Sequence, residues 1–282
     1  MPSFVISFTL SDLDWFAAAG HDRNPLHADD SYARRSPFGE RVVHGVLAGL
    51  TCLGKLPRRS GRRLRRIVVE FPRPIFTGVD YSVAVDDLES DRAAIRLSDG
   101  PMLLLRGMLD FEEGQVDRPT ALFGSTDAPP SARTWNDDAL VPGTQLSVPF
   151  EIEEDAYYQL ERRFALGERG IAAWQAIVIA GTSYLVGMHL PGERALFSRL
   201  KIDFVGEARP SGPLSFNATV KTFDRRMKVL RIAVDVRSGD RSVATGELQA
   251  FARHGTRALD IPSGDRSSTL ANKVALVIGG SR

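Results

Sequence analysis

Apolar and polar positions in the first half of the chain change from a strand-like alternation to a helical spacing and back again. Residues 4–9 alternate as in a short strand, and Ser11 or Asp12 can cap a helix that follows. The continuous apolar run over 46–53 indicates a buried helix. Four strands are then predicted near 64–75, 79–88, 92–98 and 102–111, the last pair joined by an Asp-Gly-Pro turn. One long helix followed by an antiparallel sheet is therefore the expected plan.

The second half repeats this order. Residues 112–145 are rich in Pro, Asp, Ser and Gly and are predicted to be a linker or a long crossover. The elements expected after it are a strand near 146–152, a polar helix from Glu153, an apolar helix over 171–188, and strands near 195–206, 213–223, 228–237 and 242–253. Identity between the halves is weak, so two tandem units are inferred from element order alone.

Composition narrows the class of protein. The chain has 282 residues, of which 43% are hydrophobic and 25% charged, as expected for one large or two modest globular domains. A net charge of +1 argues against general binding of polyanions. The single cysteine, Cys52, excludes an internal disulfide and fits a reducing compartment. Neither a signal peptide nor an apolar stretch of about 20 residues is evident, so a cytoplasmic location is expected.

The candidate chemistry lies between residues 20 and 45. Asp22 and His27 bracket the turn-forming pair Asn24-Pro25, and such a turn can aim an acid and a base into one pocket. Gly45 opens the apolar helix, and a glycine at that position lets a ligand oxygen approach free backbone N–H groups.

These residues resemble the signature of the MaoC-like (R)-specific enoyl hydratase/dehydratase family, whose members have a hotdog fold and act on acyl thioesters. The resemblance covers about residues 4–111, including the segment 71–78. It implies an α+β protein, here a tandem (double) hotdog in which each unit has a long central helix wrapped by an antiparallel sheet. Two departures are visible: His21 stands before Asp22 where the family usually has glycine, and the helix after Gly45 lacks the serine that the family often has there.

The resemblance implies that Asp22 and His27 are the catalytic acid–base pair for a 3-hydroxyacyl or 2-enoyl thioester. Gly45 would donate its N–H to the thioester carbonyl, and Asn24 would either contact substrate or brace the loop. His44 would orient the neighbouring loop and has no chemical role. The second half has no such pair, so its helix is expected to pack beside the first and help wall the substrate tunnel. The structural alternative is that Asp22 caps the turn and His27 is an ordinary loop histidine.

Two further patterns bear on ligands. The histidines and acids of this region match no metal-ligand spacing, so no metal is expected. Six arginines fall within 58–66, where Arg62 and Arg63 would contact a phosphate or a carrier protein, or else form a solvated loop. The expected partner is an acyl-CoA or acyl carrier protein thioester, without nucleic acid or membrane, and the protein is expected to be a monomeric pseudo-dimer or a homodimer.

The last residues, 272–282, resemble the opening of a short-chain dehydrogenase/reductase. Gly279 and Gly280 would then belong to a dinucleotide-binding turn, so that NAD(P) would bind a longer parent protein, whereas no cofactor is expected for the covered chain. An ordinary strand with a flexible tail is the alternative. The domains predicted are 1–113 (catalytic hotdog), 114–145 (linker or crossover), 146–254 (degenerate hotdog), 255–271 (polar linker) and 272–282 (possible reductase start).

The leading functional hypothesis is thus a hydro-lyase that interconverts (R)-3-hydroxyacyl and 2-enoyl thioesters in fatty-acid or polyketide-type metabolism. A non-catalytic hotdog module that binds acyl chains or acyl carrier protein is the alternative from another class, and His21 and the missing serine keep it open. An oxidoreductase is considered only for a longer parent protein. A hotdog thioesterase is less expected, because the helix after Gly45 has no carboxylate.

Overall fold

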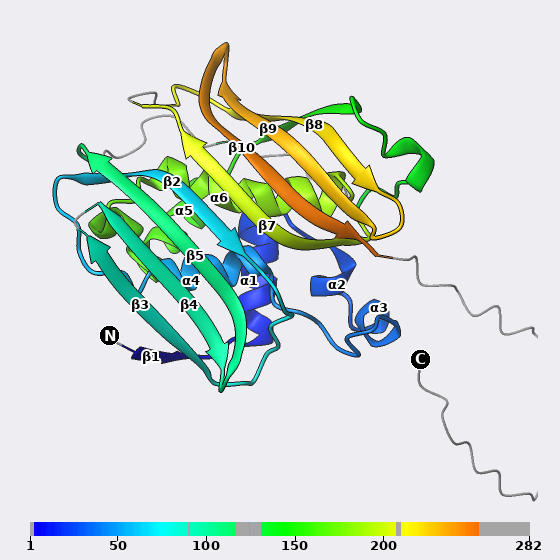
Figure 1. The fold of residues 1–282 in the computed structure, drawn as a ribbon, viewed down its shortest axis with the longest axis horizontal. Coiled ribbons are helices and arrows are strands. Elements are labelled where there is room, and N and C mark those ends of the chain that lie inside the picture. Colours follow the sequence, from blue (N-terminus) through cyan, green and yellow to red (C-terminus); the bar gives the residue numbers. More distant parts are fainter. Residues whose placement is uncertain (1–2, 90, 117–123, 125–130, 207–209, 254–282) are drawn as a thin grey trace, which may run out of the picture.

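The computed structural model describes residues 3–89, 91–116, 124, 131–206 and 210–253, and its main feature is a ten-stranded antiparallel sheet (Figure 1). Its order is β1-β3-β4-β5-β2-β7-β10-β9-β8-β6, so each half of the chain supplies five neighbouring strands in the same order from edge to centre. The strands are β1 (Ser3–Ile6), β2 (Arg62–Glu70), β3 (Tyr81–Glu89), β4 (Arg92–Asp99), β5 (Met102–Glu113), β6 (Gln145–Phe150), β7 (Ala195–Phe204), β8 (Leu214–Asp224), β9 (Val229–Ser238) and β10 (Arg241–Ala252).

The two halves meet at the centre of the sheet, where β2 pairs antiparallel with β7. The register sets Arg66 opposite Asp203 and Glu70 opposite Arg199, and these opposed charges form ion pairs. Cross-strand pairs of opposite charge stabilise such a seam. The repeated element order is the one that the tandem prediction requires.

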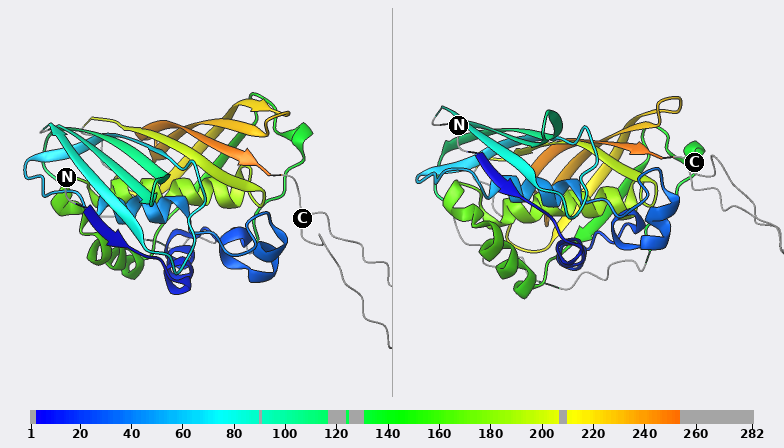
Figure 2. Two further views of the ribbon diagram at one scale, coloured as in Figure 1. Left: turned by 60° about the horizontal axis from the view of Figure 1, so that its bottom comes forward. Right: turned by 90° about the horizontal axis from the view of Figure 1, so that it is seen from below.

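The helices lie on one face of the sheet, as both views of Figure 2 show. They are α1 (Leu10–Gly20), α2 (Pro25–Ala28), α3 (Asp30–Arg35), α4 (Gly45–Leu53), α5 (Glu154–Phe164) and α6 (Ala173–Tyr184), with short 3₁₀ turns at Asp137–Ala139 and Leu166–Arg169 and a π-helical turn at Leu185–His189. Every residue of α6 is buried, and α4 packs against it beneath the sheet. A helix that is apolar on all sides belongs in a core, which explains both positions. The α+β class is confirmed.

Several predicted boundaries differ from the structure; the strand predicted over 4–9, for example, ends at Ile6. Thr9, rather than Ser11 or Asp12, caps α1: the Asp12 N–H donates to Thr9 Oγ1 at 3.2 Å while the Thr9 N–H donates to Asp12 Oδ2 at 2.7 Å. The strand predicted to reach residue 75 ends at Glu70, because Pro72 and Pro74 have no N–H to donate to a neighbouring strand. The helix predicted to run over 171–188 ends as α6 at Tyr184 and continues as the π-helical turn.

Parts of two predictions fall outside the described residues. These parts are residues 117–123 and 125–130 of the predicted linker and the whole segment 254–282, which includes Gly279 and Gly280. In the part of the chain that is described, no helix is long and apolar enough to cross a membrane.

Candidate active site

A cavity of about 100 Å³ opens at the start of α4, and both halves of the chain line it. From the first half come Asp22, His27 and Gly45, together with apolar residues of the segment that follows β2. From the second half come Ser183, Gly187 and the first residues of β7. The structure thus brings the predicted acid, base and helix start together, and it adds a wall that the second half supplies.

Asp22 lies in the loop between α1 and α2 with only 2% of its surface exposed. Ser183 Oγ donates a 2.6 Å hydrogen bond to Asp22 Oδ2, and the Asn24 N–H donates to Oδ1 at 3.2 Å. A Cβ on Gly187 would stand 2.7 Å from Asp22 Cγ, so only glycine leaves room for this carboxyl group. Burial raises the pKa of Asp22, and the two hydrogen bonds and His27 oppose that rise.

His27 is held by α2, which begins at Pro25 with Asn24 as its cap. Its Nδ1 lies 2.6 Å from the carbonyl oxygen of Val42. A carbonyl only accepts, so Nδ1 carries the hydrogen and Nε2 keeps a free lone pair. Burial is the main cause that lowers the pKa of His27 to about 3, with His44 adding to it. The imidazole is therefore neutral at neutral pH and able to accept a proton.

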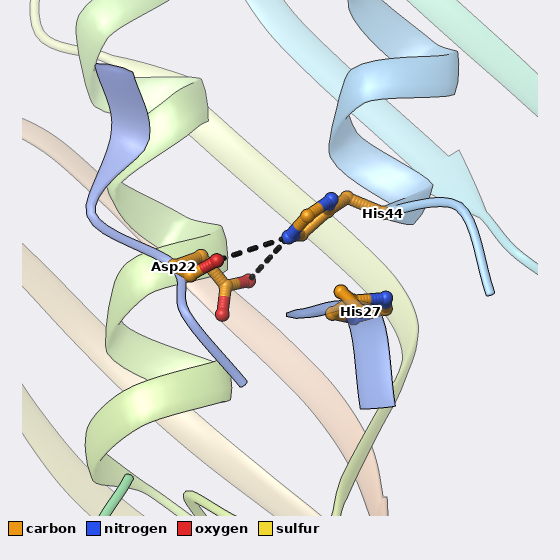
Figure 3. A group of neighbouring side chains, drawn as sticks. All are labelled: Asp22, His27 and His44. Carbon is orange, nitrogen blue, oxygen red and sulfur yellow. Dashed lines mark hydrogen bonds and ion pairs between the residues drawn. The ribbon is translucent and has the colours of Figure 1, made fainter. Parts of the chain in front are cut away.

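The third titratable side chain here is His44, whose ring stacks on that of His27 with 4.0 Å between ring centres (Figure 3). Asp22, His27 and His44 offer potential metal-ligand atoms within 4.8 Å of one another. However, the nitrogen of His44 that faces Asp22 donates to a backbone carbonyl, and His27 Nδ1 is bound to Val42. Because the His44 nitrogen that faces Asp22 is occupied, the Asp22 carboxylate and His27 Nε2 remain as ligands at this place, fewer than the three protein ligands of a catalytic zinc site.

Gly45 is the first residue of α4 and faces the cavity. The N-cap residue His44 makes no side-chain capping bond, so the cap leaves the N–H groups of the first turn to a ligand. The ring of Phe71 would lie 2.9 Å from a Cβ at this position. Tight packing and an accessible backbone donor therefore both require glycine here.

Asn24 braces the loop. Its Nδ2 donates to the carbonyls of Gly187 at 2.8 Å and Gly192 at 2.9 Å, and its Oδ1 accepts from the Leu26 N–H at 3.0 Å. The side chain is 1% exposed, and backbone groups use its donors and its acceptor. The geometry supports the brace among the two roles expected for Asn24; the residue also lines the cavity, and contact with substrate stays a prediction.

Comparisons with known proteins show the family to which the chain belongs. A family model described as a MaoC like domain matches residues 5–95. The (R)-specific enoyl-CoA hydratase of Aeromonas caviae is 31% identical over 97 residues, which are 32% of this chain and 72% of that protein. The chain belongs to the MaoC-like dehydratase family. The 3-hydroxybutyryl-CoA dehydratase of Methylorubrum extorquens is 36% identical over 93 residues, 31% of this chain, and the chain spans only 59% of that relative's length.

Among solved structures, a MaoC domain protein dehydratase from Chloroflexus aurantiacus superposes with a TM-score of 0.63 at 12% identity. The match covers 90% of this chain and 95% of that one, so the likeness in fold extends over both halves. The hotdog fold predicted from the motif is confirmed.

The first departure from the MaoC-like pattern has a structural explanation. His21 ends α1 in the left-handed conformation, with φ of 57°, a position that glycine commonly occupies. Its Nε2 lies 3.1 Å from the carbonyl oxygen of Glu151, and its ring meets the edges of Phe150 and Tyr184. His21 therefore links the MaoC-like first half to the second half and does not line the cavity.

For the second departure, no serine replaces the one absent from the helix after Gly45, but a serine of the second half, Ser183 on α6, lines the cavity and donates to the Asp22 carboxyl group. Ser183 and Gly187 were not expected as site residues. The only signal for them is a pair of small residues four positions apart within a long apolar segment, where both fall on one helix face.

Arg62 and Arg63 are not brought to the cavity. They begin β2, whose other end leads to Phe71 at the cavity wall, so roughly 30 Å of strand separates the two places. Arg63 Nε donates to Glu112 on the neighbouring strand at 2.8 Å. A contact between these arginines and a carrier stays a prediction, and it would lie far from the acid–base pair.

Proposed function

We propose that this chain is a hydro-lyase that adds water reversibly to 2-enoyl thioesters and gives (R)-3-hydroxyacyl thioesters. The observation that carries the proposal is one small cavity in which a buried carboxyl group, a neutral imidazole and an uncapped helix start all meet. The names of the relatives, a dehydratase and an enoyl-CoA hydratase, support the same reaction class.

In dehydration, His27 Nε2 takes the proton from the α-carbon while the β-hydroxyl leaves. The raised pKa of Asp22 favours its protonated form, which gives the proton that the leaving hydroxyl needs to depart as water. Hydration is the reverse and begins with transfer of the Asp22 proton to His27: the carboxylate then takes a proton from water as oxygen bonds to the β-carbon, and the imidazolium gives its proton to the α-carbon, which restores a neutral His27 and a protonated Asp22.

The negative charge that develops on the thioester oxygen is stabilised by the Gly45 N–H at the start of α4. A donor of this kind typically contributes about 3 kcal/mol to the stability of a transition state. The partial positive charge at the helix start acts in the same direction.

The proposed substrate is an acyl-CoA or acyl carrier protein thioester. The names of the relatives include both kinds of thioester. Two relatives are named for CoA thioesters, and a mitochondrial relative from Arabidopsis thaliana is named 3-hydroxyacyl-[acyl-carrier-protein] dehydratase. That last match is 45% identical over 40 residues, 24% of the relative's length.

The test is hydration of crotonyl-CoA, followed as loss of the enoyl absorbance. We expect activity in the wild type and losses of at least about 100-fold in Asp22→Asn and in His27→Ala, with circular dichroism and Tm close to wild type. A wild type that is inactive on CoA and on carrier protein thioesters alike would contradict the proposal and leave the non-catalytic binding module.

A longer parent protein with a C-terminal ketoreductase remains part of the proposal for residues 272–282. It is supported only by the resemblance of those residues to a reductase opening. Sequencing the transcript across and beyond this segment tests it, and the absence of any following dinucleotide-binding fold would refute it.

A further inference from the structure

His44 contacts both the proposed acid and the proposed base. It is the N-cap residue of α4, yet its side chain makes no capping bond, and that side chain is 0% exposed. One neighbour of the imidazole is Phe16, with ring centres 4.9 Å apart, and another is His27, with ring centres 4.0 Å apart and an interplanar angle of 30°. The ring is therefore fixed by its neighbours and points toward the Asp22 loop (Figure 3).

The hydrogen bonding of His44 fixes its tautomer. Nε2 lies 3.0 Å from the carbonyl oxygen of Asp22 and 4.0 Å from Asp22 Oδ2. Because a carbonyl only accepts, Nε2 carries the hydrogen. Nδ1 is buried and has no hydrogen-bond partner among the described residues. An apolar ring of the same shape would avoid that unsatisfied nitrogen but would leave the Asp22 carbonyl without its donor, so the bond to the Asp22 main chain is what the histidine supplies here.

We infer that His44 is a positioning residue, which holds the main chain of Asp22 and the ring plane of His27 so that both reacting groups face one cavity. This inference rests on the proposed hydro-lyase function.

The contacts of His27 show how the positioning works. The carbonyl of Val42 binds His27 Nδ1, and His44, two residues later, covers the face of the same ring. A hydrogen bond fixes the direction of the ring edge, whereas a stack fixes the ring plane. Together they leave His27 Nε2 with one orientation. Arrangement of reacting groups matters at this scale, since a misplacement of about 1 Å can cost roughly 100-fold in rate.

The charges around His27 give the inference a pH-dependent readout. The groups near it are Asp22, His44, Arg253 and Arg41, whose guanidinium donates to the His27 carbonyl. Burial lowers the pKa of His44 to about 4 and that of His27 to about 3, so His44 takes up a proton first on acidification. A protonated His44 then opposes protonation of His27.

The experiment compares His44→Phe, which keeps a ring but loses the donor, with His44→Gln, which keeps a donor but loses the ring. In each variant we expect kcat for crotonyl-CoA hydration to fall about 10- to 100-fold with KM within about twofold of wild type. In His44→Phe the acidic limb of the kcat profile should move to higher pH, because the like-charged neighbour of His27 is gone. His189→Phe is the matched control, since His189 also contacts an aromatic ring and has a pKa lowered to about 4, but that ring belongs to Tyr184 and not to His27.

A measurement that does not need activity separates this inference from the proposed function. Imidazole ¹⁵N NMR shifts report the tautomer and pKa of His27 directly. We expect the Nδ1–H tautomer in the wild type, mixed tautomers in His44→Gln and a higher His27 pKa in His44→Phe. An inactive wild type would refute the function alone. Unchanged His27 signals, unchanged kcat in both variants, or an equal loss in His189→Phe would overturn the positioning role.

Discussion

The contact between Gly187 and Asp22 gives the sharpest prediction for this site. In Gly187→Ala the new Cβ would stand 2.7 Å from Asp22 Cγ, whereas ordinary contact for a Cβ begins at 3.4 Å. The carboxyl group must therefore withdraw by the difference, about 0.7 Å, and its Oδ1 lies closer still. The 2.6 Å bond from Ser183 to the same carboxyl group limits that withdrawal. A displacement near 1 Å corresponds to about 100-fold in kcat, or about 2.7 kcal/mol of transition-state stabilisation.

Stability should respond differently from activity. Alanine is favoured over glycine within a helix by up to about 1 kcal/mol, which offsets part of the strain. We therefore expect Tm within about 4 °C of wild type. The assay is crotonyl-CoA hydration at saturating substrate beside a thermal melt. Gly49→Ala on α4 is the control, because its Cβ would meet only Leu105 Cδ1 at 4.0 Å, and it should keep full activity. Wild-type kcat in Gly187→Ala would refute the reasoning.

Three other outcomes are expected. Ser183→Ala removes a hydrogen bond that lowers the pKa of Asp22, so the alkaline limb of the pH profile of kcat should move to higher pH. An alkaline limb that does not move would argue against protonated Asp22 as the acid. The pKa values of about 3 for His27 and about 4 for His44 lie below the ordinary 6.5, so the native state binds fewer protons than the unfolded state. The free energy of unfolding, measured in urea, should therefore be highest above pH 6.5 and fall progressively as the pH drops toward 4. A wild-type free energy that does not change with pH would contradict this prediction. Asn24→Ala leaves buried carbonyls without their donor and should lower the free energy of unfolding by about 1–3 kcal/mol in the same assay, a cost that a substrate-contacting side chain would not show.

What the sequence predicted well is local in the chain. Asp22 and His27 are five residues apart across a turn-forming Asn-Pro pair, so a single short segment determines that they meet. The place of Gly45 at a helix start could also be predicted from local sequence, because a glycine that opens an apolar run marks such a start. The element order of both halves also follows from periodicity, since strands and helices have different repeats.

What the sequence did not predict depends on contacts between distant segments. Ser183 is 161 residues from Asp22, and within an apolar helix a serine has no pattern that distinguishes a site residue from a core residue. His44 gives no local sign of its stack on His27, because that contact requires the loop and the helix start to be folded together.

The arginine run is a strong sequence pattern for which the structure shows a structural use, while a contact with a carrier stays a prediction. Clustering of like charge in sequence indicated an anion site. On β2, however, successive side chains point to opposite faces, and neighbouring strands supply the carboxylates. Arg63 pairs with Glu112 from β5, and Arg66 pairs with Asp203 from β7. The charges that look crowded along the chain are thus separated and paired across the sheet.

The surroundings of Asp22 come from both halves of the chain. Asp22 lies in the first half, whereas Ser183 and Gly187, which bind its carboxyl group and leave room for it, lie in the second. Because the Ser183 hydroxyl lowers the pKa of Asp22 while burial raises it, a change on α6 can alter the proposed proton donor without any change in the first half. The second half thus tunes a reacting group that it does not itself supply.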